Sequence, residues 1–381
     1  LWMDKFGIMP PDIEPWATEH INEMIDFIQR LIEKGFAYES GTDVYFNVRS
    51  FKKYGRLSGR SLDEMIAGAR VTPGETKRDP LDFALWKKSK DNEPYWESPW
   101  GRGRPGWHIE CSAMSTYYLG ETFDIHAGGR DLIFPHHENE IAQSEAATGK
   151  QFANYWLHNG MLTINGEKMA KSLNNFVTVE EVLKKIHPDA VKIFFLSAKY
   201  NAPIDFSWTR LNEAKASKER FDSFFAKVAS IKSHKNGLQF RKNTEKIFNR
   251  YYLKLADSES RFLQAMDDDF NTALALSFLY EILSEGNKIH EDSGLDFAGR
   301  IFLLVKASKA LHRLGSVFSL FSSQNVDTQN NGLINGVVKI REQIRASKNF
   351  ELADKIRTIL QDAGIIIEDS KSSSSWRKLE N

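Results

Sequence analysis

The feature that most restricts the fold of this 381-residue chain is a change of hydrophobic pattern near residue 175. Before it, short runs of β-branched and aromatic residues alternate with helical segments, which is typical of an α/β domain with a parallel sheet. After it, apolar residues recur at helical spacing. The predicted helices span residues 177–199, 209–234, 243–266, 271–290 and 296–320, with Asp267-Asp268-Asp269 among the breaks. The chain is therefore predicted to join an α/β domain to a helical bundle.

The first hundred residues predict one helix and a module of short strands. Residues 17–35 carry apolar side chains at helical spacing and end at Gly35, a common helix stop. Val44-Tyr45-Phe46 is typical of a short strand. Residues 49–105 are irregular and rich in Gly, Pro, Lys and Trp. This stretch indicates an inserted module built of short strands and loops.

The remaining elements are predicted from short apolar runs and turn residues. They are a strand at 122–125 running into Gly128-Gly129, a helix at about 135–148, a strand at 161–164, a linker at 322–335, helices at about 335–347 and 350–363, and two short strands at 365–367 and around Trp376. The tail is thus predicted to form a small α+β module.

Composition excludes several classes of protein. The 51 basic residues equal the 51 acidic ones, so a strongly basic nucleic-acid coat is excluded and any RNA contact must rest on local patches. A single cysteine excludes an intramolecular disulfide and fits a reducing compartment. No apolar run reaches about 18 residues, so no membrane span is predicted. The start lacks the features of a signal peptide and has no Met at position 1, so we expect a cytoplasmic protein whose sequence begins before Leu1.

The densest group of chemically active side chains is His136-His137-Glu138-Asn139-Glu140. His136 and Glu140 are four positions apart and share one face of a helix, and Cys111 lies 25 positions earlier. A thiolate, an imidazole and a carboxylate are ligands that zinc accepts, and they argue against calcium or magnesium. Spacing alone leaves a second interpretation open, in which Cys111 is a small core residue and the histidines line a helix.

A second group, His126 to Asp131, is predicted at the end of a strand. Gly128 and Gly129 would let the backbone approach a ligand closely, and ligands of open α/β sheets bind beyond the carboxyl ends of the strands. Asp131 could accept the proton of a ribose hydroxyl in a hydrogen bond. An ordinary tight turn is the alternative.

A third group, Lys168-Met169-Ala170-Lys171-Ser172, follows Gly166. Two lysines three positions apart on a loop could both reach the phosphates of a nucleotide and offset negative charge that develops during phosphoryl or adenylyl transfer. The alternative is a solvated loop with two ordinary lysines.

The tail also carries a predicted basic face with an aromatic residue, Trp376, among its cations. Positive side chains beside an aromatic ring suit single-stranded RNA, although a solvated helix surface fits equally well. The cations are Lys339, Arg341, Arg345, Lys348, Lys355, Arg357, Arg377 and Lys378.

Taken together and in this order, these strings resemble the cysteinyl-tRNA synthetases, which are class I aminoacyl-tRNA synthetases. The resemblance covers essentially the whole chain. It rests on residues 17–21, 79–87, 104–114, 134–144, 168–172, 266–272 and 376–378. The blocks around Cys111 and His136 are highly specific, whereas Ala170 stands where the family most often has serine.

The resemblance implies a zinc ion, with ATP and Mg²⁺ as substrate, and a reaction that joins cysteine to tRNA(Cys) in a monomeric protein. The implied roles are zinc ligation by Cys111, His136 and Glu140; lining of the amino-acid pocket by Trp107 and His126; ATP contact by Gly128, Gly129, Asp131 and Lys171; catalysis by Lys168 and Lys171; and tRNA contact by Trp376 and Arg377. Selection of a thiolate by a soft metal ion would discriminate against serine without an editing step.

The resemblance also implies how the chain divides into domains, and it shows that two of the family's motifs are missing from this sequence. The division is the end of a first nucleotide-binding half (1–20), a connective insertion (21–100), the second half of a Rossmann-like catalytic domain (101–160), the signature-loop and stem-contact region (161–210), a helical bundle (211–321) and an anticodon-binding module (335–381). The family's fourth zinc ligand, a cysteine, and its His-x-Gly-His motif for ATP are both lacking here. We therefore expect a fragment that is inactive alone.

Two other functions remain open at this point. The cysteine ligase of mycothiol synthesis resembles the synthetase core but needs no anticodon module, so the tail argues against it. A non-catalytic RNA-binding protein is the second alternative, and the intact Cys111, His136, Glu140, Lys168 and Lys171 argue against it.

Overall fold

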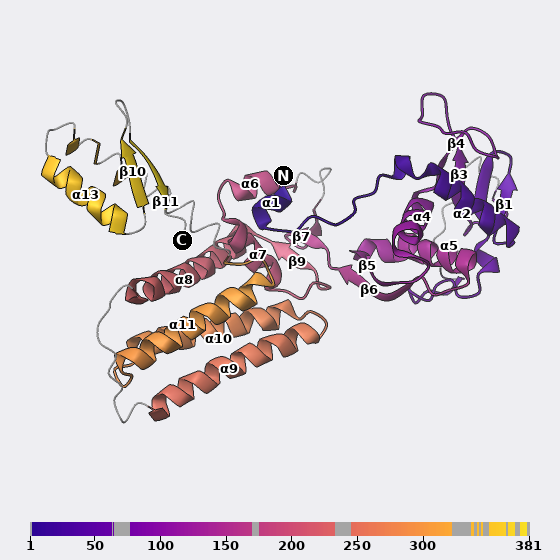
Figure 1. Ribbon diagram of the computed structural model, residues 1–381. Coiled ribbons are helices and arrows are strands. Elements are labelled where there is room, and N and C mark those ends of the chain that lie inside the picture. Colours follow the sequence, from indigo (N-terminus) through magenta and orange to yellow (C-terminus); the bar gives the residue numbers. More distant parts are fainter. Residues whose placement is uncertain are drawn as a thin grey trace. The chain divides into compact units, whose positions relative to one another are not determined.

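The computed structural model describes residues 2–62, 64, 77–169, 175–232, 245–321, 337–338, 341–342, 344–345, 350–362, 365–369 and 374–378 (Figure 1). The chain divides into two compact units. The first comprises Leu1–Arg220 and Arg261–Ser277, and the second comprises Phe221–Ser260 and Phe278–Asn381. Among the described residues, no helix combines the length and the apolar composition needed to cross a membrane.

The N-terminal part of the first unit contains the predicted helix and short strands, and the strands form a small antiparallel sheet on which the helix packs. Its elements are α1 (Trp2–Phe6), η1 (Ala17–Glu19), α2 (Ile21–Glu33), β1 (Ala37–Ser40), β2 (Asp43–Phe46), η2 (Val48–Ser50), β3 (Phe83–Lys88) and β4 (Gly103–Pro105). The strands pair in the order β1-β2-β3-β4. Helix α2 turns Met24, Ile28 and Leu31 into a core that Trp86 of β3 also enters, and all four side chains are fully buried. The helix ends before Gly35, whose φ of +78° suits glycine.

Two helices and a pair of parallel strands follow. Helix α4 (Trp107–Leu119) packs against α5 (Glu138–Thr148), and β5 (Phe123–Gly129) runs parallel to β6 (Ala153–Asn159). Between β5 and α5 lie the short turns η3 (Arg130–Leu132) and η4 (Ile133–His137). Strand β6 is absent from the sequence prediction, because apolar and polar residues do not alternate along its sequence, ANYWLHN.

The rest of the first unit includes a three-stranded sheet and two helices. The strands β7 (Leu162–Ile164), β8 (Glu167–Lys168) and β9 (Ile204–Phe206) pair in the order β8-β7-β9. The single helix predicted over 177–199 is wrong: it is two helices, α6 (Val179–Leu183) and α7 (Pro188–Leu196). Pro188 starts α7 because a proline fits the first turn of a helix but breaks the interior, and the His187 side chain caps it by accepting a hydrogen bond from the Asp189 N–H.

The four remaining long helices confirm the predicted helical segments. They are α8 (Trp208–Lys232), α9 (Glu245–Asp267), α10 (Thr272–Glu291) and α11 (Phe297–Ser316). Within the second unit, the buried side chains of these helices include Phe221, Phe224, Leu255, Leu279, Ile282, Leu283, Leu303 and Leu311. The predicted break at Asp267-Asp268-Asp269 is confirmed as the turn between α9 and α10.

The close approach of Gly286 to Phe224 gives a prediction for the stability of this helical part. A Cβ at Gly286 would lie 2.5 Å from Cε2 and 2.7 Å from Cζ of the buried Phe224 ring. Gly286→Ala is expected to cost about 1–3 kcal/mol through overpacking, which outweighs the gain of about 0.5–1 kcal/mol in helix propensity. Denaturant unfolding measures the difference, with Ser284→Ala at a nearby exposed site of α10 as the control that gains propensity without a clash. A stabilised Gly286→Ala variant would contradict the prediction.

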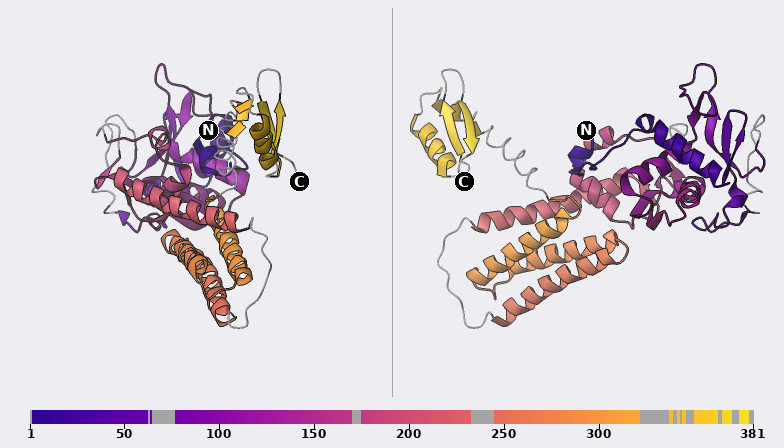
Figure 2. Two further views of the ribbon diagram at one scale, coloured as in Figure 1. Left: turned by 90° about the vertical axis from the view of Figure 1, so that its left-hand side faces the viewer. Right: turned by 45° about the vertical axis from the view of Figure 1, so that its right-hand side comes forward.

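The C-terminal module confirms the predicted α+β tail. Helix α13 (Phe350–Asp362) packs on β10 (Ile365–Asp369), which pairs antiparallel with β11 (Ser374–Lys378) in the register Ile367↔Trp376 (Figure 2). The other expected helix, at about 335–347, is only partly described, and residues 337–338, 341–342 and 344–345 are helical there. Val338, Leu360 and Ile367 form the small core. The predicted linker at 322–335 lies outside the described residues.

Candidate metal and substrate site

Two packed helices bring the predicted metal ligands together. Cys111 lies one turn into α4, which starts directly after β4, and Gly106 makes this junction possible because a Cβ there would lie 2.0 Å from the Ala84 carbonyl oxygen. His136 lies in η4 and Glu140 in the first turn of α5. The ligand atoms of Cys111, His136 and Glu140 all lie within 4.8 Å of one another. The structure therefore places the three predicted ligands in one group.

Glu140 is the centre of this group and is fully buried. Its Oε1 lies 2.9 Å from Nε2 of His136, and its Oε2 lies 3.0 Å from Nε2 of His126. Burial works to raise the pKa of Glu140, but the contacts with the two imidazoles outweigh burial and hold the pKa at about 2. The carboxylate is therefore ionised at neutral pH.

The geometry around Glu140 fits a metal ion. Both carboxylate oxygens are buried, and although the imidazole nitrogens are near, neither contact has the alignment of a hydrogen bond. A buried ionised carboxylate needs a partner, and its oxygens here face a thiol and an imidazole rather than well-aligned donors. The set of one sulfur, one nitrogen and one oxygen suits a borderline-soft divalent ion.

Cys111 is partly buried in a negative environment. Burial raises the pKa of its thiol to about 12, and the charges of Glu140 and Glu110 act in the same direction. The thiol is therefore protonated at neutral pH in the absence of a cation. Because a metal ligates the thiolate, binding of a divalent cation here would release the proton.

A cluster of histidines surrounds the ligands and extends beyond the sequence prediction. Nδ1 of His108 lies 2.8 Å from Nδ1 of His136, and Nδ1 of His137 lies 2.8 Å from Nε2 of His158. His126, His137 and Glu140 form a second group whose ligand atoms lie within 4.8 Å of one another. Burial lowers the pKa values of His108 and His137 to about 4, so both rings are neutral at pH 7.

His158 was missed because strand β6 was missed. The parallel register pairs Gly128 with His158, which places the imidazole beside the end of β5. A strand predicted after α5 would have indicated this residue, but the apolar and polar residues of 153–159 do not alternate as they do in a half-buried strand. His108 stands in the GWHIEC string, but its spacing from His136 does not indicate the contact between their rings.

Trp107 and His126, the two residues predicted to line the amino-acid pocket, contact members of this group. Trp107 is 59% exposed, and its ring centroid lies 4.4 Å from that of His136. His126 comes from β5 and contacts Glu140. A Cβ at Gly128 would lie 2.7 Å from the His137 ring, so this glycine is required by packing within the protein, a cause that the sequence did not indicate. Asp131 lies in η3, just beyond β5.

The predicted lysine loop begins from a tight hairpin. Asn165 and Gly166 take positive φ angles between β7 and β8, as a two-residue hairpin turn requires. Asp205 of β9 holds the turn, because its Oδ1 accepts hydrogen bonds of 2.8 Å from the Thr163 hydroxyl and the Gly166 N–H. Lys168 lies in β8, whereas Lys171 lies outside the described residues.

The basic face predicted for the C-terminal module is wrong at one residue. Arg341 is 1% exposed, and its guanidinium donates two hydrogen bonds of 2.7 and 3.0 Å to the carboxylate of Asp369. Arg341 thus serves the interior of the module and is no part of a solvated face. Trp376 and Arg377 lie in β11, and their contact with tRNA stays a prediction.

Comparisons with known proteins give the class of protein. Residues 2–216 match the model of the class I (C) tRNA synthetase catalytic domain, and residues 261–322 match the DALR domain. A methionyl-tRNA synthetase of Mycobacterium tuberculosis solved with methionyl-adenylate shares the fold, with a TM-score of 0.59 at 13% identity over 82% of this chain and 76% of that one. The chain is a class I aminoacyl-tRNA synthetase, with a catalytic domain and a helical domain.

The curated relatives narrow the class to one family. A cysteine–tRNA ligase of Sulfurihydrogenibium sp. is 47% identical over 98% of this chain, one of Geobacter metallireducens is 48% identical over 98%, and one of Thermococcus gammatolerans is 46% identical over 99%. The chain spans 79% of the length of each of these relatives. The chain belongs to the cysteine–tRNA ligase family. It is therefore a ligase of a family that uses ATP.

Proposed function

We propose that the protein, as its gene encodes it, activates cysteine with ATP and transfers the cysteinyl group to the 3′ end of tRNA(Cys), and that a zinc ion held by Cys111, His136 and Glu140 of this chain selects the substrate thiol. One observation carries the metal part of this proposal. The buried carboxylate of Glu140 has two oxygens without an aligned hydrogen bond, and it lies within ligand distance of a thiol and an imidazole.

The metal would supply the selectivity for cysteine. Zinc binds a thiolate far more strongly than it binds the hydroxyl of serine, so the ion gives a discrimination that pocket shape alone cannot. The chain's own residues would orient the amino acid. We assign the lining of the amino-acid pocket to Trp107, whose ring centroid lies 4.4 Å from that of His136, and to His126, whose Nε2 lies 3.0 Å from Oε2 of Glu140.

The chemistry needs no protein nucleophile. In the first step the carboxylate of cysteine attacks the α-phosphorus of ATP, and pyrophosphate leaves. In the second step the terminal ribose hydroxyl of tRNA attacks the carbonyl carbon of the adenylate, and AMP leaves. Alignment of the reactants and positive charge near the phosphates supply the catalysis. We assign the charge to Lys168 and Lys171, and the adenosine contact to Gly128, Gly129 and Asp131.

Lys171→Ala tests the assignment of the lysine loop. The variant is expected to lower the rate of adenylate formation by about 10²–10³-fold, because it removes a cation from developing phosphate charge. The dissociation constant for cysteine should change much less. Cysteine-dependent pyrophosphate exchange measures both quantities, with Lys184→Ala, an exposed lysine directly after α6, as the control. An equal loss in cysteine binding would refute the role.

The C-terminal module favours the tRNA enzyme over the ligase that joins activated cysteine to an amino-sugar. That ligase has no need of a module such as α13 with β10 and β11. The two activities are separated by assaying the protein as its gene encodes it. Pyrophosphate exchange together with cysteinylation of tRNA supports the proposal, exchange without tRNA charging supports the amino-sugar ligase, and no exchange contradicts both enzymes.

A further inference from the structure

The loop at residues 54–58 is fastened to the turn of helix that carries the candidate metal ligands. Both oxygens of Glu138 accept hydrogen bonds from the backbone of this loop: Oε1 from the Gly55 N–H at 2.9 Å and Oε2 from the Ser58 N–H at 2.8 Å. The hydroxyl of Tyr54 donates to Oδ1 of Asn139, the next residue of α5. The loop and the helix are about 80 positions apart in the sequence, so this contact is a tertiary one.

Glu138 is fully buried, so its carboxylate oxygens require hydrogen-bond donors from the protein. A carboxylate taken out of water is costly unless its oxygens are hydrogen-bonded, and charge-assisted hydrogen bonds from backbone N–H groups are among the stronger ones. Both oxygens are engaged here. The position of the loop is therefore tied to the position of this single side chain.

Glu138 lies between two of the candidate ligands along the helix. His136 precedes it by two residues and Glu140 follows it by two. Two residues correspond to about 200° around an α-helix. Glu138 therefore lies on the face of this helical turn that is opposite to the ligand group, whereas Glu140 lies on the face toward the group. A shift of Glu138 would move Glu140 as a rigid neighbour.

This turn does not start as a regular helix. Phe134 has φ and ψ of −138° and 129°, which interrupt the helical path just before His136. Arg60 covers the Phe134 ring, with its guanidinium carbon 5.0 Å from the ring centroid. The segment that bears His136 is thus in contact with Arg60, just after the 54–58 loop, as well as with the loop itself.

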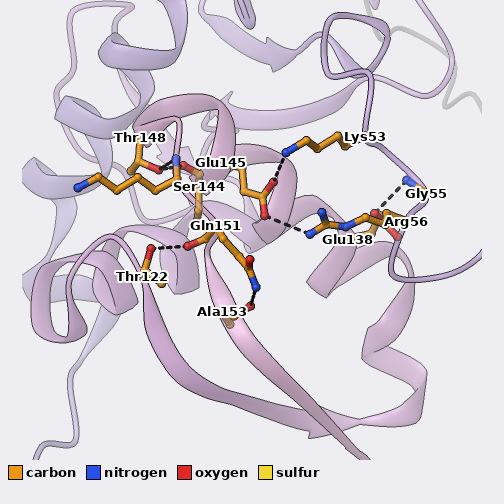
Figure 3. Close-up of polar contacts among 11 residues, drawn as sticks. Lys53, Gly55, Arg56, Thr122, Glu138, Ser144, Glu145, Thr148, Gln151 and Ala153 are labelled. Atoms are coloured by element: carbon orange, nitrogen blue, oxygen red, sulfur yellow. Dashed lines mark hydrogen bonds and ion pairs between the residues drawn. The ribbon is translucent and has the colours of Figure 1, made fainter.

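A second set of contacts from the same loop region reaches further along α5. Nζ of Lys53 lies 3.7 Å from Oε2 of Glu145, and Nη2 of Arg56 lies 3.4 Å from its Oε1 (Figure 3). Glu145 is five residues past Glu140 and belongs to neither of the candidate metal groups found among the described residues. It offers a matched comparison, since it is a buried glutamate of the same helix with partners in the same segment.

We propose that Glu138 is a positioning residue for the metal centre: its hydrogen bonds to the 54–58 loop fix the turn that presents His136 and Glu140 and thereby set the affinity for the metal ion. This inference rests on the proposed zinc site. It also gives the connective insertion a role in selection of the amino acid, because the metal would bind the substrate thiol. Residues that orient metal ligands from behind typically change metal affinity by about 10–100-fold when replaced.

The test is the rate of zinc release to a chromogenic chelator from the zinc-loaded protein as its gene encodes it. Glu138→Gln keeps the shape but replaces one acceptor oxygen by an amide donor, which leaves either the Gly55 or the Ser58 N–H without its partner. We expect zinc release to accelerate about 10–100-fold and the preference for cysteine over serine in pyrophosphate exchange to fall. Glu145→Gln is expected to leave zinc release unchanged.

Each outcome decides between the alternatives. Equal release from Glu138→Gln and wild type would overturn the positioning role while leaving the zinc site intact. A wild-type protein that binds no zinc would overturn the zinc site and the positioning role together. If Glu138→Gln does not fold, Tyr54→Phe provides the second variant, because it removes only the hydrogen bond to Asn139; a smaller acceleration of zinc release supports the proposal, and no acceleration contradicts it.

Discussion

Cys111→Ser is expected to lower the affinity for zinc by more than about 100-fold, since replacing even a residue behind a ligand costs about 10–100-fold and this change removes the ligand itself. A serine hydroxyl stays protonated and binds zinc weakly, whereas the thiol of Cys111 becomes a thiolate when a cation binds. The expected loss is specific to the metal, because the side chain keeps nearly the same size on a helix that is otherwise unchanged.

Activation of cysteine should fall in parallel with zinc content. Elemental analysis of the purified variant measures the metal, and cysteine-dependent pyrophosphate exchange measures activation. Ser115→Ala, one turn further along α4, is the control for an altered side chain on the same helix. A Cys111→Ser variant with unchanged metal content would show that Cys111 is no ligand. If the variant keeps its full zinc content but loses cysteine activation, Cys111 acts on the substrate and does not bind the metal.

The part of the site that sequence could predict is the part that rests on local spacing. His136 and Glu140 share a helical face because they are four positions apart, and together with Cys111 they form a set of residue types that zinc accepts. Spacing left a core role for Cys111 open, and the family resemblance favoured the metal. The long amphipathic helices were predictable for the same reason. In α2, apolar residues such as Met24, Ile28 and Leu31 repeat at the helical period, and all three are buried in the structure.

The part that sequence could not predict depends on partners distant along the chain. The contact between the 54–58 loop and Glu138 joins a glutamate to backbone N–H groups, which carry no sequence signature. His158 comes to the site only through the parallel register of β5 and β6. Arg341 lies in a run of basic residues, and its burial follows from Asp369, 28 positions later. The roles of Glu138 and His158 were not predicted and Arg341 was assigned to the surface, because the contacts of all three are with residues distant in the sequence.

The pair formed by Arg341 and Asp369 gives the second large prediction. The Arg341 guanidinium also donates a hydrogen bond of 3.2 Å from Nε to the Ala353 carbonyl, so it joins the Asp369 strand to α13. Asp369→Ala would remove the carboxylate that accepts two hydrogen bonds from the buried Arg341 and also pairs with Arg345, and breaking a buried ion pair typically costs about 3–5 kcal/mol. That amount is close to the whole stability that a module of this size can have. The module is therefore expected to unfold at ordinary temperature.

The consequences for the two steps of the reaction should differ. Cysteine-dependent pyrophosphate exchange is expected to stay near the wild-type rate, because Cys111, His136 and Glu140 lie in the first unit, whereas Arg341 and Asp369 lie in the second. Cysteinylation of tRNA is expected to fall sharply if the module binds the anticodon. Glu342→Gln, next to Arg341 on the same helical segment, is the control that removes a charge without breaking the buried pair.

A double replacement separates loss of the pair from loss of the fold. Arg341→Met with Asp369→Leu removes both charges and puts apolar groups in their place, a change that is often neutral or stabilising for a buried ion pair. The double variant is expected to regain the cooperative unfolding transition that Asp369→Ala loses. If it folds and charges tRNA, the pair acts only by stabilising the module. If it folds and fails to charge tRNA, Arg341 and Asp369 act on the RNA-binding surface itself, and the assignment of Arg341 to the interior alone would be wrong.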